Sequence, residues 1–138
     1  MVDKPKLDQM LHNLKNYVEA LRKLAAVPRE EFLKDLDKIG NAKYQFVISI
    51  ECSIDIANHV IASENFRFPK DNADSFAILV EHGVLPEGTR ESLRAMAGFR
   101  HRLVHLCRDV DDESVYSYLK ESLGDIDGFA AAVTAVFG

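Results

Sequence analysis

Apolar residues recur along this 138-residue chain at helical spacings. Between residues 7 and 24 they fall three and four positions apart, which places them in one stripe along a helix. The stripe consists of Leu7, Met10, Leu11, Leu14, Tyr17, Val18, Leu21 and Leu24. Charged side chains lie off the stripe, as they do in an amphipathic helix that packs against a core. The pattern therefore predicts a first helix over residues 7–24.

A second long apolar segment follows at residues 29–63, which is predicted to be mostly helical with an interruption near Gly40. Its part from residue 42 to 62 is apolar on nearly all sides, as expected of a central helix surrounded by others. Glu51, Asp55 and His59 stand out because they lie four residues apart and share one face. They form either a partly exposed stripe or, in the functional interpretation, a support in which Asp55 or His59 serves a site elsewhere.

The second half of the chain alternates turn signals with shorter periodic segments. Further helices are predicted over residues 75–82, 90–104, 112 or 114 to 123, and 125–137. Gly83 would close the first of these, and Thr89 would cap the second. In the preceding loop, Phe66 and Phe68 bracket Arg67, either as pins for the loop or as a platform for a base.

No strand pattern competes with these helices, and the length suits one domain with a sizeable core. We therefore expect an all-α fold over residues 1–138, an antiparallel bundle of four long helices with one or two short ones. Apolar residues make up 47% and charged residues 28%, which is ordinary for a soluble protein. There is no apolar run of 18 residues, no visible signal peptide and no disulfide framework, since the chain has two cysteines. The expected location is the cytoplasm, away from membranes.

Charge is concentrated in residues 90–108, which carry a formal +4 within a chain of −5. The window holds five arginines and one acid: Arg90, Arg94, Arg100, Arg102, Arg108 and Glu91. A basic patch on an acidic body suits a phosphate-bearing ligand or an acidic partner surface. The acidic total argues against a protein that coats nucleic acid without specificity.

The densest chemistry lies between Gly98 and Asp109, with three arginines, two histidines and one cysteine. Histidine titrates near neutral pH and can transfer protons, and arginine can stabilise a phosphate or a developing phosphorane. Together they suffice for attack of an RNA 2′-hydroxyl on the adjacent phosphate, without a metal. The simpler interpretation is a helix end with solvated arginines.

The order of these residues also resembles a known signature. Arginine, four residues and then histidine, near a helix end in a small all-helical chain, resembles the motif of the HEPN superfamily. Arg100 and His105 match it here. The flanks Met96–Arg100 and Leu103–His105, with the apolar helix around Ile54–His59, are similar to the HepT-type toxin branch. The likeness runs from about residue 7 to 136.

The resemblance implies a metal-independent endoribonuclease without a cofactor, usually the toxin of a type II or type VII-like toxin–antitoxin pair. It implies RNA as substrate and a minimal nucleotidyltransferase as antitoxin. Arg100 would stabilise the phosphate and His105 would act as general base or acid. In this interpretation His101, Arg102 and Arg108 hold RNA, and Asp55 and His59 support the motif.

Two positions depart from that branch. Its antitoxin modifies with AMP a tyrosine two residues after the histidine, where this chain has Cys107, so inhibition by tyrosine modification is in doubt here. Directly after the arginine the branch often has Asn or Asp, where this chain has His101.

No metal site is assigned, because His101 and His105 have the i, i+4 spacing of two ligands but the sequence fixes no third. A Cys107 nucleophile would lack an oxyanion motif.

The spacing of the motif raises a geometric problem. Residues five apart on an ideal helix point about 140° away from each other. Either the helix ends or kinks between Arg100 and His105, or a second chain completes the site in a homodimer whose two motifs face each other. Two alternatives remain beside the ribonuclease: a non-catalytic module of this fold that binds a nucleotide or a protein, and a helical scaffold.

Overall fold

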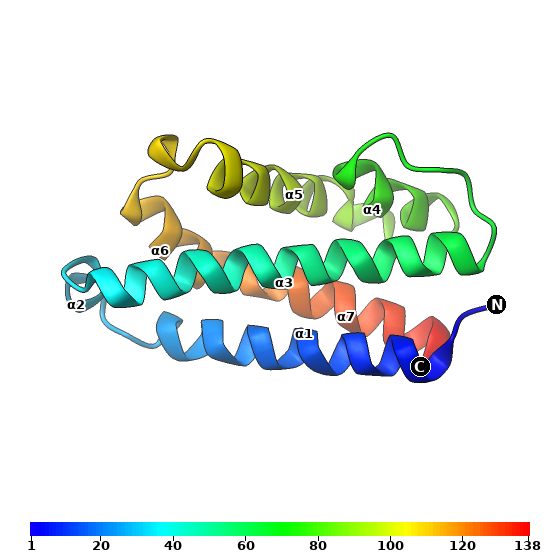
Figure 1. The fold of residues 1–138 in the computed structure, drawn as a ribbon, viewed down its shortest axis with the longest axis horizontal. Helices are drawn as coiled ribbons and strands as arrows, with labels where there is room; N and C mark the ends of the chain where they lie inside the picture. Colours follow the sequence, from blue (N-terminus) through cyan, green and yellow to red (C-terminus); the bar gives the residue numbers. More distant parts are fainter.

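The computed structural model describes residues 1–138, except for the side chain of Cys107. Seven α-helices and two short 3₁₀ helices make up its regular structure, and no strand occurs in the described residues (Figure 1). The α-helices are α1 (Lys4–Ala25), α2 (Arg29–Leu33), α3 (Leu36–Ser63), α4 (Asn72–Glu81), α5 (Arg90–His105), α6 (Asp112–Glu121) and α7 (Leu123–Phe137). The predicted all-α fold is confirmed. Four helices have fifteen residues or more, and three shorter ones accompany them.

Helix α3 lies in the middle of the molecule, with α1 along one side and α4 and α5 along the other (Figure 1). Its neighbours α1 and α5 run antiparallel to it. The predicted central helix is thus confirmed, and its two buried serines are satisfied by donation to backbone carbonyls within α3. By length and composition alone α3 is apolar enough to cross a membrane, but half of its most apolar stretch is buried inside the protein. A core helix has that pattern.

The apolar stripe of the first helix is confirmed in α1, which buries five leucine and valine side chains: Leu7, Leu14, Val18, Leu21 and Leu24. The predicted interruption near Gly40 is wrong. Gly40 lies exposed inside α3, and the break comes earlier, at Lys34 and Asp35. The physical reason is capping: the Asp35 carboxylate accepts from the backbone N–H groups of residues 37 and 38, at 3.0 and 3.2 Å.

Helices α4 and α5 are joined by a turn whose chemistry differs from the prediction at one residue. Gly83 closes α4 with φ of +74°, a value that favours glycine, as expected. Thr89 ends the 3₁₀ turn Glu87–Thr89, and its hydroxyl donates to the carbonyl of Pro86 at 2.7 Å instead of capping α5. The helix itself begins at Arg90, as predicted.

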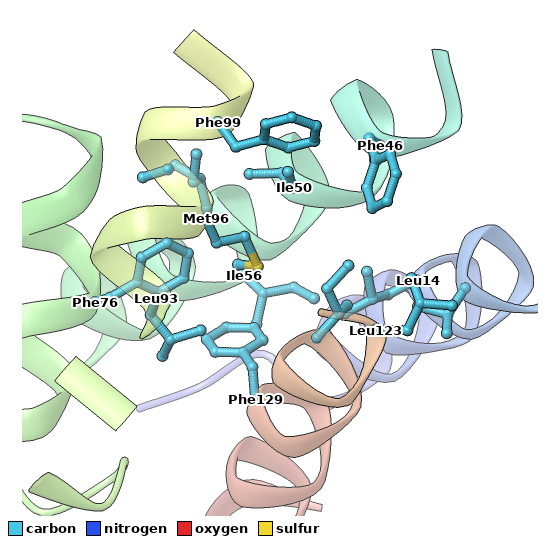
Figure 2. Packing of buried hydrophobic residues seen from close by; sticks show 14 of the residues in the cluster. Leu14, Phe46, Ile50, Ile56, Phe76, Leu93, Met96, Phe99, Leu123 and Phe129 are labelled. Atoms are coloured by element: carbon cyan, nitrogen blue, oxygen red, sulfur yellow. The ribbon is translucent and has the colours of Figure 1, made fainter. Parts of the chain in front are cut away.

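Aromatic rings join the central helix to its neighbours. The Phe46 ring of α3 meets the Phe99 ring of α5 edge-on, with 5.3 Å between centroids. Phe76 of α4 meets Phe129 of α7 in the same way at 5.4 Å (Figure 2). Because Phe99 directly precedes Arg100, this core contact fixes the position of the chemically rich end of α5.

Candidate functional site

Arg100 and His105 both belong to α5, which continues without a kink through the motif. The helix ends at His105, because Leu106 leaves the helical region at φ −130° and ψ 40°. A backbone bond from the Leu106 N–H to the Arg102 carbonyl, at 2.8 Å, closes the last turn. One of the two expected routes to convergence, a bend between the two residues, is therefore not what this chain uses.

Arg100 turns toward α3 and binds Glu51. Its Nε and Nη2 both donate to Oε1 of Glu51, at 3.2 and 2.6 Å, and its side chain is 20% exposed. A guanidinium has five N–H donors, so this contact leaves Nη1 and part of Nη2 available to a further anion. Glu51 holds Arg100 at the surface between α3 and α5. The sequence marked Glu51 as one of three polar residues on a face, but not as a site residue.

The other two members of that α3 face lie apart from the motif. The pKa of Asp55 is raised, mainly because the surrounding protein removes part of the water around its carboxyl group, and to a smaller extent because of the charge of Glu51. His59 is half-buried, and its Nε2 has no hydrogen-bond partner among the described residues. The described residues contain no hydrogen bond or ion pair from either side chain to Arg100 or His105. Their supporting role stays a prediction.

The two histidines of α5 lie together at the surface. The rings of His101 and His105 are 4.8 Å apart at 48°, and both residues are exposed. In the described part of the chain, no three His, Cys, Asp or Glu residues are grouped to hold a metal ion. Both rings are therefore accessible to a ligand.

Two arginines complete the basic surface. The Arg102 guanidinium lies over the Phe99 ring, 5.8 Å from its centroid, and Phe99 in turn stacks on Tyr118 at 3.7 Å. Arg102 and Arg108 are exposed, and neither forms an ion pair with another described residue. Both charges are thus open to an anionic ligand.

Exposed apolar side chains occur at the end of the molecule where α5 ends. Val104 is 42% exposed and Leu106 46%, and Tyr44 of α3 is 60% exposed. Tyr44 shares the face of Glu51, two turns away toward the end of α5, because α3 and α5 are antiparallel. We call Tyr44, Val104 and Leu106 the apolar patch.

The side chain of Cys107 lies outside what the structure describes, so the predictions about its thiol stay untested. Two tyrosines follow it on α6. The Tyr116 hydroxyl donates to the carbonyl of Val27 at 2.8 Å and its side chain is buried. Tyr118 is half-buried beneath Phe99.

Comparison with known proteins identifies the family of the chain. The family model described as Ribonuclease HepT-like matches residues 14–133. This chain belongs to the HepT-like ribonuclease family. Within it, the chain is 27% identical over 85 residues to the mRNA nuclease HepT of Shewanella oneidensis, covering 62% of this chain and 64% of that protein. The chain thus matches less than two thirds of that relative's length.

A second curated relative and several solved structures support the assignment. The tRNA nuclease HepT of Aphanizomenon flos-aquae is 20% identical over 117 residues, covering 85% of this chain and 80% of that protein. A tri-AMPylated HEPN toxin of Shewanella oneidensis, solved in complex with its MNT antitoxin, superposes with a TM-score of 0.87 at 21% identity, over 98% of this chain and 99% of that one. The cytosolic protein YutE of Bacillus subtilis gives 0.83 at 20%, over 98% and 90%. These likenesses confirm the HEPN fold that the motif indicated.

Proposed function

We propose that this chain is an endoribonuclease that cleaves RNA without a metal ion, as the toxin of a toxin–antitoxin pair. The observation that carries this proposal is that one helix, α5, presents both Arg100, which Glu51 holds at the surface with N–H groups to spare, and two exposed histidines. The family of the chain and the nuclease names of its relatives support the same conclusion.

The proposed chemistry follows from the side chains. His105 takes the proton of the RNA 2′-hydroxyl, whose oxygen attacks the adjacent phosphorus. The free N–H groups of Arg100 stabilise the extra negative charge of the phosphorane. A proton donor then protonates the leaving 5′-oxygen. Meanwhile His101, Arg102 and Arg108 hold the flanking phosphates.

The proton donor points to a dimer. His105 cannot serve as base and acid at opposite ends of the same scissile bond in one step, and α5 does not bend to bring Arg100 and His105 to one side. A two-fold arrangement of α5 ends supplies the partner's His105 as the acid. It would also cover the apolar patch, whose three exposed side chains lack a partner within the chain.

Dilution tests the shared site. We expect a dimer by light scattering at micromolar concentration, and a specific activity that falls as the dimer dissociates. Val104→Asp should weaken the dimer and lower activity together, because it places a carboxylate in the proposed interface. Val136→Asp makes the same change at an exposed valine near the C-terminal end of α7, which lies at the opposite end of the molecule (Figure 1), and this matched control should change neither. A monomer with full specific activity would exclude the shared site.

Glu51→Gln tests the role of the carboxylate that holds Arg100. The amide keeps the shape but removes the charge, so Arg100 loses its fixed position. We expect a cleavage rate lower than that of the wild type but higher than that of Arg100→Ala. Because Glu51 is 42% exposed, the free energy of unfolding should change by no more than about 1 kcal/mol. Rates and denaturant unfolding measured on the same preparations separate the two effects, and an unchanged rate would remove Glu51 from the site.

The proposed metal-independent cleavage is tested by incubating the purified protein with RNA in EDTA. The His105→Ala variant is the control for contaminating nucleases. Cleavage that persists in EDTA and disappears in the variant supports the proposal. Binding of RNA or a nucleotide without cleavage would favour the non-catalytic module.

We further propose a minimal nucleotidyltransferase as the antitoxin and the cytosol as the location. The solved toxin of Shewanella oneidensis in complex with an MNT antitoxin and the cytosolic YutE support these assignments by analogy of fold. We propose that the pair is of type II or of a type VII-like kind. Transfer of AMP to residue 107 is not expected, because this chain has a cysteine at the position where the resemblance to the HepT-type branch implies a tyrosine.

A further inference from the structure

The loop between α3 and α4 presents one bare aromatic ring on a well-anchored backbone. The Phe66 ring stacks on His82, 3.6 Å away at 3°. Arg67 donates to both carboxylate oxygens of Asp74, at 2.7 and 2.9 Å, and to those of Glu81, at 2.8 and 3.2 Å. Between these anchors and α4, Phe68 is 91% exposed. Its ring contributes nothing to the core, yet the loop around it is held on both sides.

A cavity of about 240 Å³ lies between α4 and α5, and the loop that carries Phe68 contributes to its lining. Lys70, two residues after Phe68, lines it together with Arg90 and Arg94 of α5. Asp71 and Asp74 lie in the same wall. The cavity is large enough for a phosphate group with some of its waters, so the balance of its charges decides what it binds.

Both acids of the cavity are already occupied. The Asp74 carboxylate is bound by Arg67 and by the Lys70 backbone N–H, and its pKa falls to about 2, chiefly because of Arg67. The Asp71 carboxylate caps α4 by accepting from the Asp74 N–H at 2.7 Å. Among the cations, Arg90 is paired with Glu87.

The other two cations are open. The Lys70 ammonium and the Arg94 guanidinium have no hydrogen bond or ion pair to any described residue. They converge on one cavity from the loop and from α5. Two cations without an ion-pair partner, one of them two residues after an uncovered ring on the same loop, match the two parts of a nucleotide, its phosphate and its base.

The surface of α5 connects this place to the motif. At 100° per residue, Arg94, His101 and His105 lie within about 40° of one another around the helix. Gly98 lies about 20° beyond this sector, and the Arg102 guanidinium is the nearest group, 3.7 Å from where a Cβ would stand. Along the axis, Arg94 lies about 16 Å from His105. A single RNA strand that follows this face of α5 passes from the cavity to the two histidines.

We propose that Phe68, Lys70 and Arg94 form a second RNA-contact site, which holds a single-stranded stretch of the substrate away from the cleaved bond. A base stacks on Phe68 and a phosphodiester binds Lys70 and Arg94. This inference rests on the proposed ribonuclease function, because the site's ligand is that enzyme's substrate.

The test measures RNA binding and cleavage in the full-length protein. A fluorescent single-stranded RNA of about 20 nucleotides is titrated with protein carrying His105→Ala, so that it stays intact. Phe68→Ala and the double variant Lys70→Ala/Arg94→Ala should each bind about fivefold more weakly or worse. Phe68→Trp should retain binding and Phe68→Leu should not. Lys15→Ala/Lys34→Ala removes the same charge from exposed, unpaired lysines elsewhere and should bind as the parent does.

With His105 present, the same substitutions should raise KM for RNA cleavage and leave kcat nearly unchanged. Wild-type binding by Phe68→Ala and by the double cation variant would overturn the second site while the ribonuclease assignment stands. Loss of binding to a purified nucleotidyltransferase antitoxin, with RNA binding intact, would overturn it in favour of a protein-docking surface. A wild-type protein that neither binds nor cleaves RNA would overturn both proposals.

Discussion

Alanine in place of Arg100 or His105 is expected to lower RNA cleavage by about 10²–10⁴-fold while leaving the protein folded. In the proposed mechanism His105 exchanges protons with the RNA, and Arg100 is the cation that stabilises the phosphorane from the α3–α5 surface. Neither side chain is part of the core: His105 is exposed, and the Arg100 side chain is 20% exposed. Removing Arg100 leaves Glu51 partly in water, so the structural cost is small.

The measurement is the single-turnover cleavage rate, with far-ultraviolet circular dichroism to confirm the fold. His12→Ala and Arg29→Ala provide matched controls, since both remove an exposed side chain of the same type from other helices. They should cleave at the wild-type rate. If Arg100→Ala and His105→Ala also kept that rate, the motif would have no catalytic role here.

Phe99→Ala is expected to destabilise the protein by about 3–5 kcal/mol, a large share of the 5–15 kcal/mol typical of a domain. Its ring is 1% exposed and contacts Phe46 edge-on and Tyr118 face to face. Its removal leaves a cavity where α5 meets α3 and α6, and takes away the ring beneath Arg102. Truncation therefore loosens the element that carries the motif.

Denaturant unfolding followed by circular dichroism measures this change. Phe68→Ala is the matched control, because the same atoms are removed from a ring that is 91% exposed, and its unfolding midpoint should hardly move. A loss below about 1 kcal/mol for Phe99→Ala would mean that the three-ring contact contributes little.

Local pattern predicted the helices well and their connections less well. The leucine stripe of α1 and the apolar α3 followed from periodicity, because burial on one face or on all faces leaves a repeat in the sequence. The break before α3 lies at Asp35 and not at Gly40. A side-chain cap determines where a helix begins more strongly than a single glycine interrupts it. The Thr89 cap failed for a related reason, since its hydroxyl binds the preceding turn.

The residues of the candidate site could be predicted from the sequence only in part. Arg100 and His105 could be selected from sequence because their residue types and spacing resemble a family motif. The partner of Arg100 could not be selected, because Glu51, Asp55 and His59 occupy equivalent positions on one helical face. Only the antiparallel packing of α3 against α5 decides which of the three lies opposite Arg100. The same holds for Phe68, whose exposure depends on which neighbouring side chains anchor the loop.

The end of α5 has a consequence for how activity and folding relate. Among the side chains that the structure describes, Leu103 is the last buried one of the helix and Val110 is the next buried one along the chain. His105 lies between them in a segment whose neighbours Val104, Leu106, Arg108 and Asp109 are all exposed. Opening this short stretch disrupts few buried contacts, so it costs far less free energy than unfolding the bundle. If His105 acts as proposed, the ordering of the site and the global stability are governed by separate equilibria, and we expect some substitutions in this stretch to abolish cleavage while the melting temperature stays the same.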